Sequence, residues 1–129
     1  MNIPEELKYS QNDEWIRVQD QMGTIGISDY AQEQLSDIVY LEIIAEVGSV
    51  INKGEICATI ESVKAAADVY APVTGKVIEV NEKLPDSPET LNSDPYGSAW
   101  MIKLELSNPS ELDDLMDFQQ YHSKLQEKE

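Results

Sequence analysis

A single lysine, Lys64, lies between two short runs of β-forming residues and is the most specific candidate for chemistry in this sequence. The run before it, 55–61, alternates apolar and polar residues, which is the period of a half-buried strand. A second short run covers 68–72. The turn between them, 62–66, contains no glycine, so packing rather than a permissive backbone must set its shape. The pattern predicts a hairpin with an accessible amine at its tip.

Other catalytic groups are scarce. The one cysteine, Cys57, is far in sequence from the one histidine, His122, and we expect a structural or semi-exposed thiol, opposite in phase to Ile56 and Ala58. A lone cysteine excludes an internal disulfide and a cysteine-based metal site. The sequence has no glycine-rich phosphate loop, no His-Glu-x-x-His pattern and no Asp-x-Asn-x-Asp loop, so no metal site is expected. Taken alone, Lys64 could still be one more solvated charge.

The composition is that of an acidic protein of 129 residues, with 25 Asp and Glu against 9 Lys and Arg and a formal net charge of −16. This length fits one domain with a modest core. A polyanion repels nucleic acid and anionic membranes, so the charge argues against both and favours a protein partner with a basic surface, unless it serves only solubility. The sequence has no long apolar run and no basic-then-apolar leader, which indicates a soluble protein of a reducing compartment, most simply cytoplasmic.

Strands are the main elements expected to position the hairpin. A hairpin over 14–27, with a polar connection at 19–22, precedes a helix of about two turns that begins after Ser28, a residue suited to the N-cap. Further strands are expected from their apolar pattern over 37–44, 76–80 and 98–106.

The remaining segments are predicted to be less regular. We expect a polar lead-in over 1–11 and an extended or irregular segment over 85–95, which holds three of the six prolines. A helical region begins near Asn108, and its apolar residues should pack on the body. The charged tail after Tyr121 is expected to fray.

The sequence around Lys64 resembles a lipoyl-attachment hairpin. The similarity covers Glu61-Ser62-Val63-Lys64-Ala65, the run 68–72 and Gly75. Biotin carriers have a similar layout but typically place methionines on both sides of the lysine, where this chain has Val63 and Ala65. The resemblance therefore implies lipoate, attached covalently to Lys64 as an amide.

Several separated motifs are similar to those of the glycine cleavage system H protein family. They extend over about residues 7–121 and lie, in the right order, at 14–18, 24–32, 35–39, 92–97 and 100–103. The resemblance implies a mainly β fold, a lipoyl/biotinyl-type barrel-sandwich hybrid of two small antiparallel sheets with a quasi two-fold relation. A short helix should follow the first hairpin. It also implies a single lipoyl-carrier domain over 1–129, with a lipoyl-binding core at about 24–106 and a C-terminal helical segment at about 108–126.

This resemblance implies a carrier without catalytic activity of its own. A PLP-dependent glycine decarboxylase would load an aminomethyl group onto lipoyl-Lys64, an aminomethyltransferase would remove it, and dihydrolipoamide dehydrogenase would reoxidise the dithiol. A lipoyl ligase or transferase would attach the lipoate. Two alternatives stay open: a lipoyl-relay protein or paralogue that passes lipoate to other enzymes, and an unmodified acidic interaction module.

The resemblance also implies a surface cleft that shelters the loaded arm. Glu14 and Asp68 match family positions that line this cleft, and Asn12 falls at a neighbouring position of variable type. A carboxylate is suited to holding a protonated amine, although ordinary surface acidity is the other interpretation. Relatives commonly have histidine where this chain has Asp13, which would add a negative charge beside the cleft.

Overall fold

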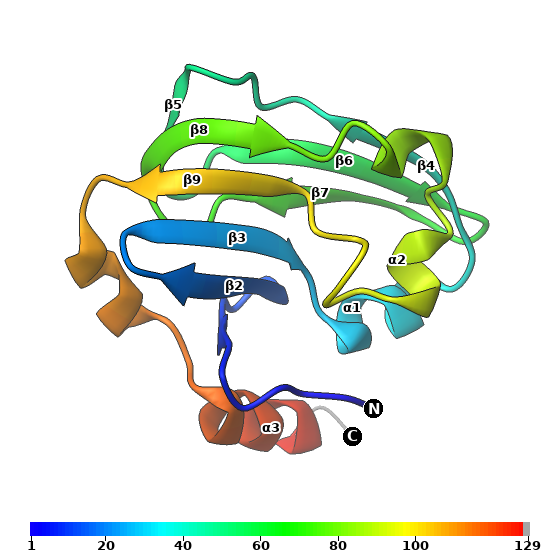
Figure 1. The fold of residues 1–129 in the computed structure, drawn as a ribbon. Coiled ribbons are helices and arrows are strands. Elements are labelled where there is room, and N and C mark those ends of the chain that lie inside the picture. The colour runs from blue at the N-terminus through cyan, green and yellow to red at the C-terminus, as the bar shows by residue number, and fades with distance from the viewer. Residues whose placement is uncertain (128–129) are drawn as a thin grey trace.

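The chain folds into two antiparallel sheets (Figure 1). The structure is a computed structural model that describes residues 1–127. Among these residues, one sheet has six strands in the order β1-β2-β3-β9-β8-β5, and the other has three in the order β4-β6-β7. The strands are β1 Lys8–Tyr9, β2 Glu14–Gln19, β3 Met22–Ile27, β4 Ile38–Ile43, β5 Val50–Ile51, β6 Ile56–Ser62, β7 Ala66–Tyr70, β8 Gly75–Val80 and β9 Ile102–Leu106. The helices are α1 Asp29–Leu35, α2 Thr90–Ser93 and α3 Phe118–Glu127, with 3-10 turns η1 Leu84–Asp86 and η2 Pro109–Asp114. The expected mainly β fold with two antiparallel sheets, a short helix after the first hairpin and C-terminal helices is confirmed.

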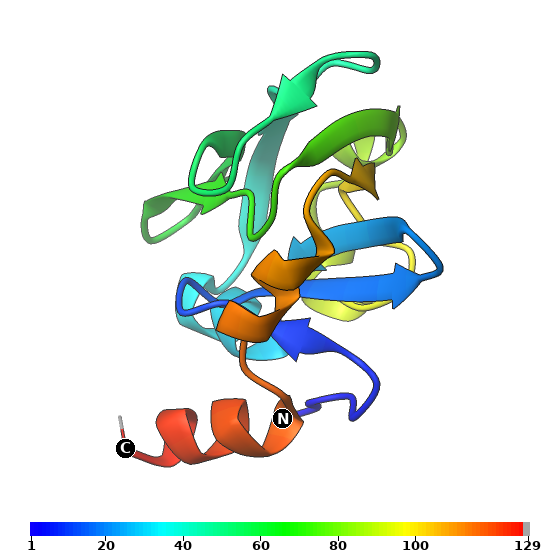
Figure 2. The same cartoon turned by 90° about the vertical axis from the view of Figure 1, so that its left-hand side faces the viewer.

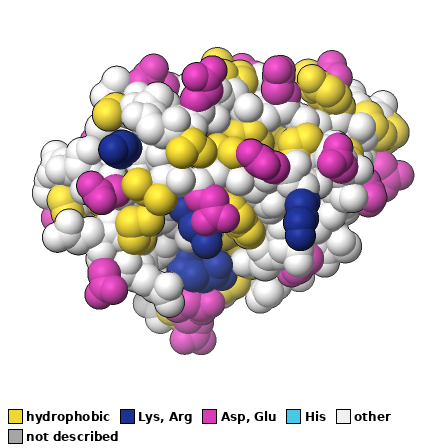
Figure 3. Space-filling view, turned by 45° about the horizontal axis from the view of Figure 1, so that its top comes forward, with side chains coloured by type: hydrophobic (Ala, Val, Ile, Leu, Met, Phe, Trp, Pro, Cys, Tyr) yellow, Lys and Arg dark blue, Asp and Glu magenta, His cyan; other side chains and the backbone are white. Residues whose placement is uncertain are grey.

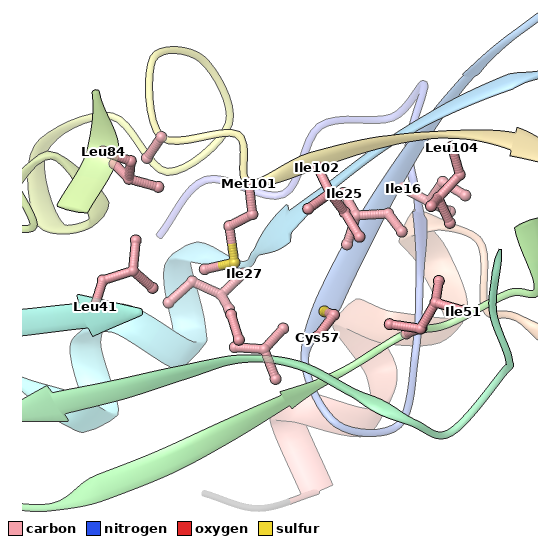
Figure 4. Close-up of a cluster of buried hydrophobic side chains, with 14 of the residues drawn as sticks. Ile16, Ile25, Ile27, Leu41, Ile51, Cys57, Leu84, Met101, Ile102 and Leu104 are labelled. Atoms are coloured by element: carbon pink, nitrogen blue, oxygen red, sulfur yellow. The ribbon is translucent and has the colours of Figure 1, made fainter. Parts of the chain in front are cut away.

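The main core lies between the two sheets. Ile25 and Ile102 of the larger sheet and Leu41 and Cys57 of the smaller one point into the same interior, and all four are fully or almost fully buried (Figure 4). Burial of this kind is the dominant favourable contribution to folding. Among the helices of residues 1–127, none is both long and apolar enough to span a bilayer.

The predicted first hairpin is present and packs around an indole. Trp15 is fully buried, and its Nε1–H donates a hydrogen bond of 3.0 Å to the carbonyl of Pro95. A Cβ atom at Gly26 would lie 2.7 Å from the Trp15 ring, so only glycine leaves room for it. The predicted N-cap is also present, because the Ser28 hydroxyl accepts the N–H of Ala31 at 3.2 Å.

Strand β6 departs from the simple alternation that its sequence suggested. The register between β6 and β7 shifts between Ile56 and Ala58, which adds one residue to β6. As a result Cys57 and Ala58 are both buried, whereas Ile56, expected on the apolar face, is 40% exposed. Burial raises the pKa of the Cys57 thiol to about 12, so this cysteine is a poor nucleophile.

The segment 85–95 is more regular than expected. It contains part of η1 and all of α2, because Pro85 lies in the first turn of η1 and Pro88 precedes α2, where a missing N–H costs no helical hydrogen bond. Leu91 is fully buried and holds α2 against the core.

Both ends of the described chain pack on each other. The expected lead-in contains strand β1, and the tail after Tyr121, expected to fray, is helical up to Glu127, with residues 128 and 129 outside the described residues. Tyr9 exchanges two backbone hydrogen bonds of 2.8 Å with Met116, and its ring stacks on Tyr121 with centroids 4.4 Å apart. Helix α3 continues through the buried Leu125 to Glu127 and lies beside the N-terminal chain (Figure 2). The two ends share a second apolar cluster, which sequence patterns of either end alone do not indicate.

Candidate functional site

Lys64 lies exposed at the tip of the β6–β7 hairpin, as predicted. The Ser62 hydroxyl accepts the N–H groups of Lys64 at 3.2 Å and Ala65 at 3.0 Å, and donates to the Ala65 carbonyl at 3.0 Å. The Val63 N–H donates to the Asp37 carbonyl at 3.0 Å, which ties the tip to the start of β4. These bonds fix a turn that lacks glycine. The Lys64 ammonium forms no ion pair with any residue from 1 to 127.

A pocket of about 340 Å³ lies at the far end of β7 from Lys64. Its walls come from three separate parts of the chain, namely residues 10–12 with Glu14 at the start of β2, the segment 70–72 from the end of β7 onwards, and Asp114 with Leu115 at the end of η2. Lys53 completes the rim and forms an ion pair of 3.1 Å with Asp114. The volume falls in the usual range of small-molecule pockets, roughly 300–1,000 Å³.

Glu14 is a buried carboxylate in the pocket wall. The residue is only 2% exposed. One carboxylate oxygen accepts the Ser10 hydroxyl at 2.5 Å, and the other accepts the Tyr70 N–H at 3.0 Å. Burial raises the pKa of Glu14 to about 7, although both hydrogen bonds oppose the rise. Because Glu14 is buried, ordinary surface acidity does not describe this residue. No cation among residues 1–127 forms an ion pair with it.

The other expected cleft residues occupy different positions. Asn12 lines the same pocket as Glu14, and its N–H donates to the Ser10 hydroxyl at 3.3 Å. Asp68 is exposed on β7 and is not part of the pocket lining. Alternate residues of a strand share a face, so Asp68 lies on the same face as Tyr70, between Lys64 and the pocket. The structure thus brings Glu14 and Asn12 together and leaves Asp68 along the approach.

Asp13 turns its carboxylate away from the pocket. It has a positive φ of 68°, and one of its carboxylate oxygens accepts the Tyr121 hydroxyl at 2.9 Å. The Tyr121 hydroxyl is also 2.6 Å from the Ser28 hydroxyl. The extra charge expected at this position is therefore engaged by α3, although it still contributes to the raised pKa of Glu14.

Three residues of the pocket, Ser10, Lys53 and Asp114, were not predicted from the sequence. No sequence pattern marks Ser10 as a partner of Glu14, apart from its position four residues earlier in the chain. Lys53 and Asp114 are 61 residues apart in the chain, so only the folded structure shows that they meet.

Similarity to known proteins shows the family of this chain. The family described as "Glycine cleavage H-protein" matches residues 7–128. The chain belongs to this family. It is 54% identical over 114 residues to the glycine cleavage system H protein of Thermotoga maritima, which covers 88% of this chain and 91% of the relative. It is 51% identical over 125 residues to the glycine cleavage system H protein of Carboxydothermus hydrogenoformans, covering 97% and 95%.

A solved H-protein structure has the same fold. The crystal structure of a glycine cleavage system H protein from Mycobacterium marinum superposes with a TM-score of 0.86 and 31% sequence identity, covering 95% of this chain and 98% of that one. Membership of the glycine cleavage H-protein family supports a lipoyl-carrier role in glycine cleavage and fits a carrier subunit rather than a catalyst.

In this H-protein family member, Ser10→Ala is expected to raise the pKa of Glu14 further. The variant removes a hydrogen bond to the ionised carboxylate, which contributes about 1.5 kcal/mol, so the pKa should rise by about 1. An NMR titration of the Glu14 carboxyl carbon measures this directly. Ser10→Thr keeps the hydroxyl and should stay near the wild-type value. A pKa in Ser10→Ala at or below that of the wild type would show that Ser10 does not support the ionised form.

Proposed function

We propose that this chain is lipoylated on Lys64 and shuttles an aminomethyl group in glycine cleavage. It would receive the group from the PLP-dependent glycine decarboxylase, deliver it to the aminomethyltransferase, and then be reoxidised by dihydrolipoamide dehydrogenase. The observation that carries the proposal is that one hairpin bears an exposed, unpaired amine at its tip and borders, at its other end, a pocket with a buried unpaired carboxylate.

The spacing between these two features suits a lipoyl-lysine arm. The four steps of β7 from Ala66 to Tyr70 cover about 13 Å at the usual strand rise. An extended lipoyl-lysine side chain is on the order of 14 Å long by summed bond projections. An arm that starts at Lys64 and folds back along β7 would therefore extend over most of the strand towards the pocket beside Tyr70.

The Lys64 amine is suited to attachment because nothing in the described residues engages it. After losing a proton, Nζ attacks the acyl carbon of an activated lipoyl donor. The new amide bond forms as the bond to the activating group breaks. That group leaves with the electron pair, and the nitrogen releases a second proton to solvent. Amidation removes the positive charge of Lys64.

The pocket residues would hold the cargo. Lipoate supplies the dithiolane that carries the aminomethyl group. Ionised Glu14 offers a charge-assisted hydrogen bond to a protonated amine, and the amine supplies the counter-charge that the buried carboxylate lacks. Asn12 borders the same space, and the exposed Asp68 attracts a cation along the approach.

The deciding experiment is exchange of the glycine carboxyl group with bicarbonate by the decarboxylase, with this protein as the carrier. We expect the lipoylated protein to support exchange at a rate that saturates with its concentration, and the unmodified protein to support none. If the lipoylated protein also supports none, the chain is a lipoyl relay or a divergent paralogue. If the native protein carries nothing on Lys64, an acidic interaction module is the remaining function.

A further inference from the structure

Strand β4 forms a free edge of the sheet that carries Lys64. Within residues 1–127, β4 pairs with β6 alone, so alternate backbone N–H and C=O groups on its other side have no strand partner. The register joins Ile38 to Ser62 and Tyr40 to Glu61. The first residues of β4 therefore adjoin the turn that presents Lys64.

A groove of about 410 Å³ runs along this edge. One wall consists of the consecutive β4 residues 40–43, and the other is formed by residues of the segment 80–85. Consecutive strand residues point to opposite faces, so a groove lined by all four follows the edge of the strand rather than one face. Its position along an unpaired strand edge suits an added extended segment.

Apolar side chains lie exposed between the groove and the lysine. Tyr40 is 46% exposed and Val63, next to Lys64, is 69% exposed. Exposed apolar groups gathered beside a functional residue mark contact surfaces more often than isolated ones do. Tyr40 lines the groove and lies opposite Glu61, so exposed apolar groups adjoin both the groove and the residues that lead to the hairpin tip.

The groove is acidic as well as apolar. Glu42 and Glu82 line its two walls, and both are exposed. Over the strands at the top of Figure 1, apolar side chains are interspersed with Asp and Glu (Figure 3). Neither carboxylate forms an ion pair with a residue from 1 to 127, so both remain available to a cationic partner.

We propose that this groove binds an extended segment of the enzyme that attaches lipoate to Lys64, a segment with apolar side chains flanked by Lys or Arg. The proposal rests on the proposed lipoylation of Lys64. The attaching enzyme must bring its activated acyl carbon to the amine itself, so its contact surface must reach the tip. Enzymes that act on the far end of an arm on the order of 14 Å long need no such contact.

The position of the groove also leaves the pocket open. The groove follows β4, whereas the Glu14 pocket borders β7, and these are the opposite edges of the three-stranded sheet. The attaching enzyme can therefore dock while the newly attached arm swings towards β7.

A kinetic comparison tests this docking site. Unmodified protein is titrated into a lipoyl ligase with ATP and lipoate, and initial rates are read from the intact-protein mass. The double variant Glu42→Lys/Glu82→Lys should raise KM about tenfold or more with a smaller effect on kcat, because it opposes a basic segment with like charge. Tyr40→Ser should also raise KM about tenfold, as loss of an apolar anchor does. Glu105→Lys, which makes half of that charge change and lies on β9, should remain within about twofold of the wild type.

Amide hydrogen exchange gives a readout that is independent of turnover. Binding of the ligase should protect amides of β4 in the wild type and protect them less in Glu42→Lys/Glu82→Lys. Equal KM values for that variant and the wild type, or unchanged β4 exchange in the complex, would overturn the docking site while lipoylation stands. Protection of β4 at high protein concentration without the ligase would assign the groove to a second copy of this chain instead. If the wild type itself is never lipoylated, the proposed function fails and the docking site fails with it.

Discussion

Lys64→Arg is expected to keep its unmodified mass after coexpression with a lipoyl ligase, under conditions in which the wild type gains one lipoyl group. The guanidinium of arginine stays protonated and cannot act as the acyl acceptor, while it preserves the charge and length of the side chain. The backbone of the turn is held by Ser62 and not by the lysine side chain, so the hairpin should remain folded. Glycine–bicarbonate exchange should fall to the background rate.

Lys53 and Lys76 provide the matched controls. Lys53 is paired with Asp114 at the pocket rim, and Lys76 lies on β8 in the other sheet. Lys53→Arg and Lys76→Arg should each gain a full lipoyl group. A persisting mass increase in Lys64→Arg, located by peptide mapping to another lysine, would show that the attachment site is wrong.

Glu14→Gln is expected to stabilise the unmodified protein at alkaline pH. Burial raises the pKa of Glu14 from 4.5 to about 7, so between these values the folded state binds more protons than the unfolded state. The free energy of unfolding therefore falls as pH rises through this window, and the full penalty is present above pH 7. From pH 5 to pH 8, stability should change in favour of the variant by about 2–3 kcal/mol.

Urea unfolding at the two pH values measures this difference. Glu105→Gln on β9 is the control, because this carboxylate is exposed and its removal should change the difference little. If Glu14→Gln gained no stability on going from pH 5 to pH 8, Glu14 would not titrate as an uncompensated buried carboxylate.

The same substitution should have the opposite effect on the loaded arm. A neutral amide cannot pair with a protonated amine, so docking of the cationic cargo should weaken by about 2 kcal/mol, or roughly thirtyfold. The backbone amide of Tyr70, which donates to Glu14, is a suitable NMR reporter of the docked fraction. In the wild type, docking should strengthen as pH rises through about 7, because ionised Glu14 is the form that pairs. A variant that docks the loaded arm as well as the wild type would remove Glu14 from this role.

Local signals were sufficient for the hairpins and the first helix. Ser28 is an N-cap whose effect lies within one turn, and the run around Lys64 needs only alternation and a turn. The phase of Cys57 could not be predicted, because a bulge adds one residue and moves the following side chains to the other face.

The pocket depends on contacts that sequence patterns do not report. Nothing around Glu14 shows that it is buried or that Ser10 and the Tyr70 N–H would be its partners, since burial is decided by strands distant in sequence. The order of α3 depends in the same way on Tyr9, 112 positions before Tyr121 in the chain, and on their ring stacking. The family resemblance predicted Glu14, Asp68 and Asn12 as cleft residues, but their environments depend on the folded chain.

The three separate walls of the pocket have a consequence for the order of events during synthesis. The strands around Lys64 lie within residues 38–70, so they can pair while later residues are still being translated. The Asp114 wall is translated after the hairpin and must then close against segments far earlier in the chain. A nascent chain therefore presents Lys64 before it possesses the complete pocket. Closure of the Asp114 wall, rather than formation of the hairpin, is the step that completes the pocket.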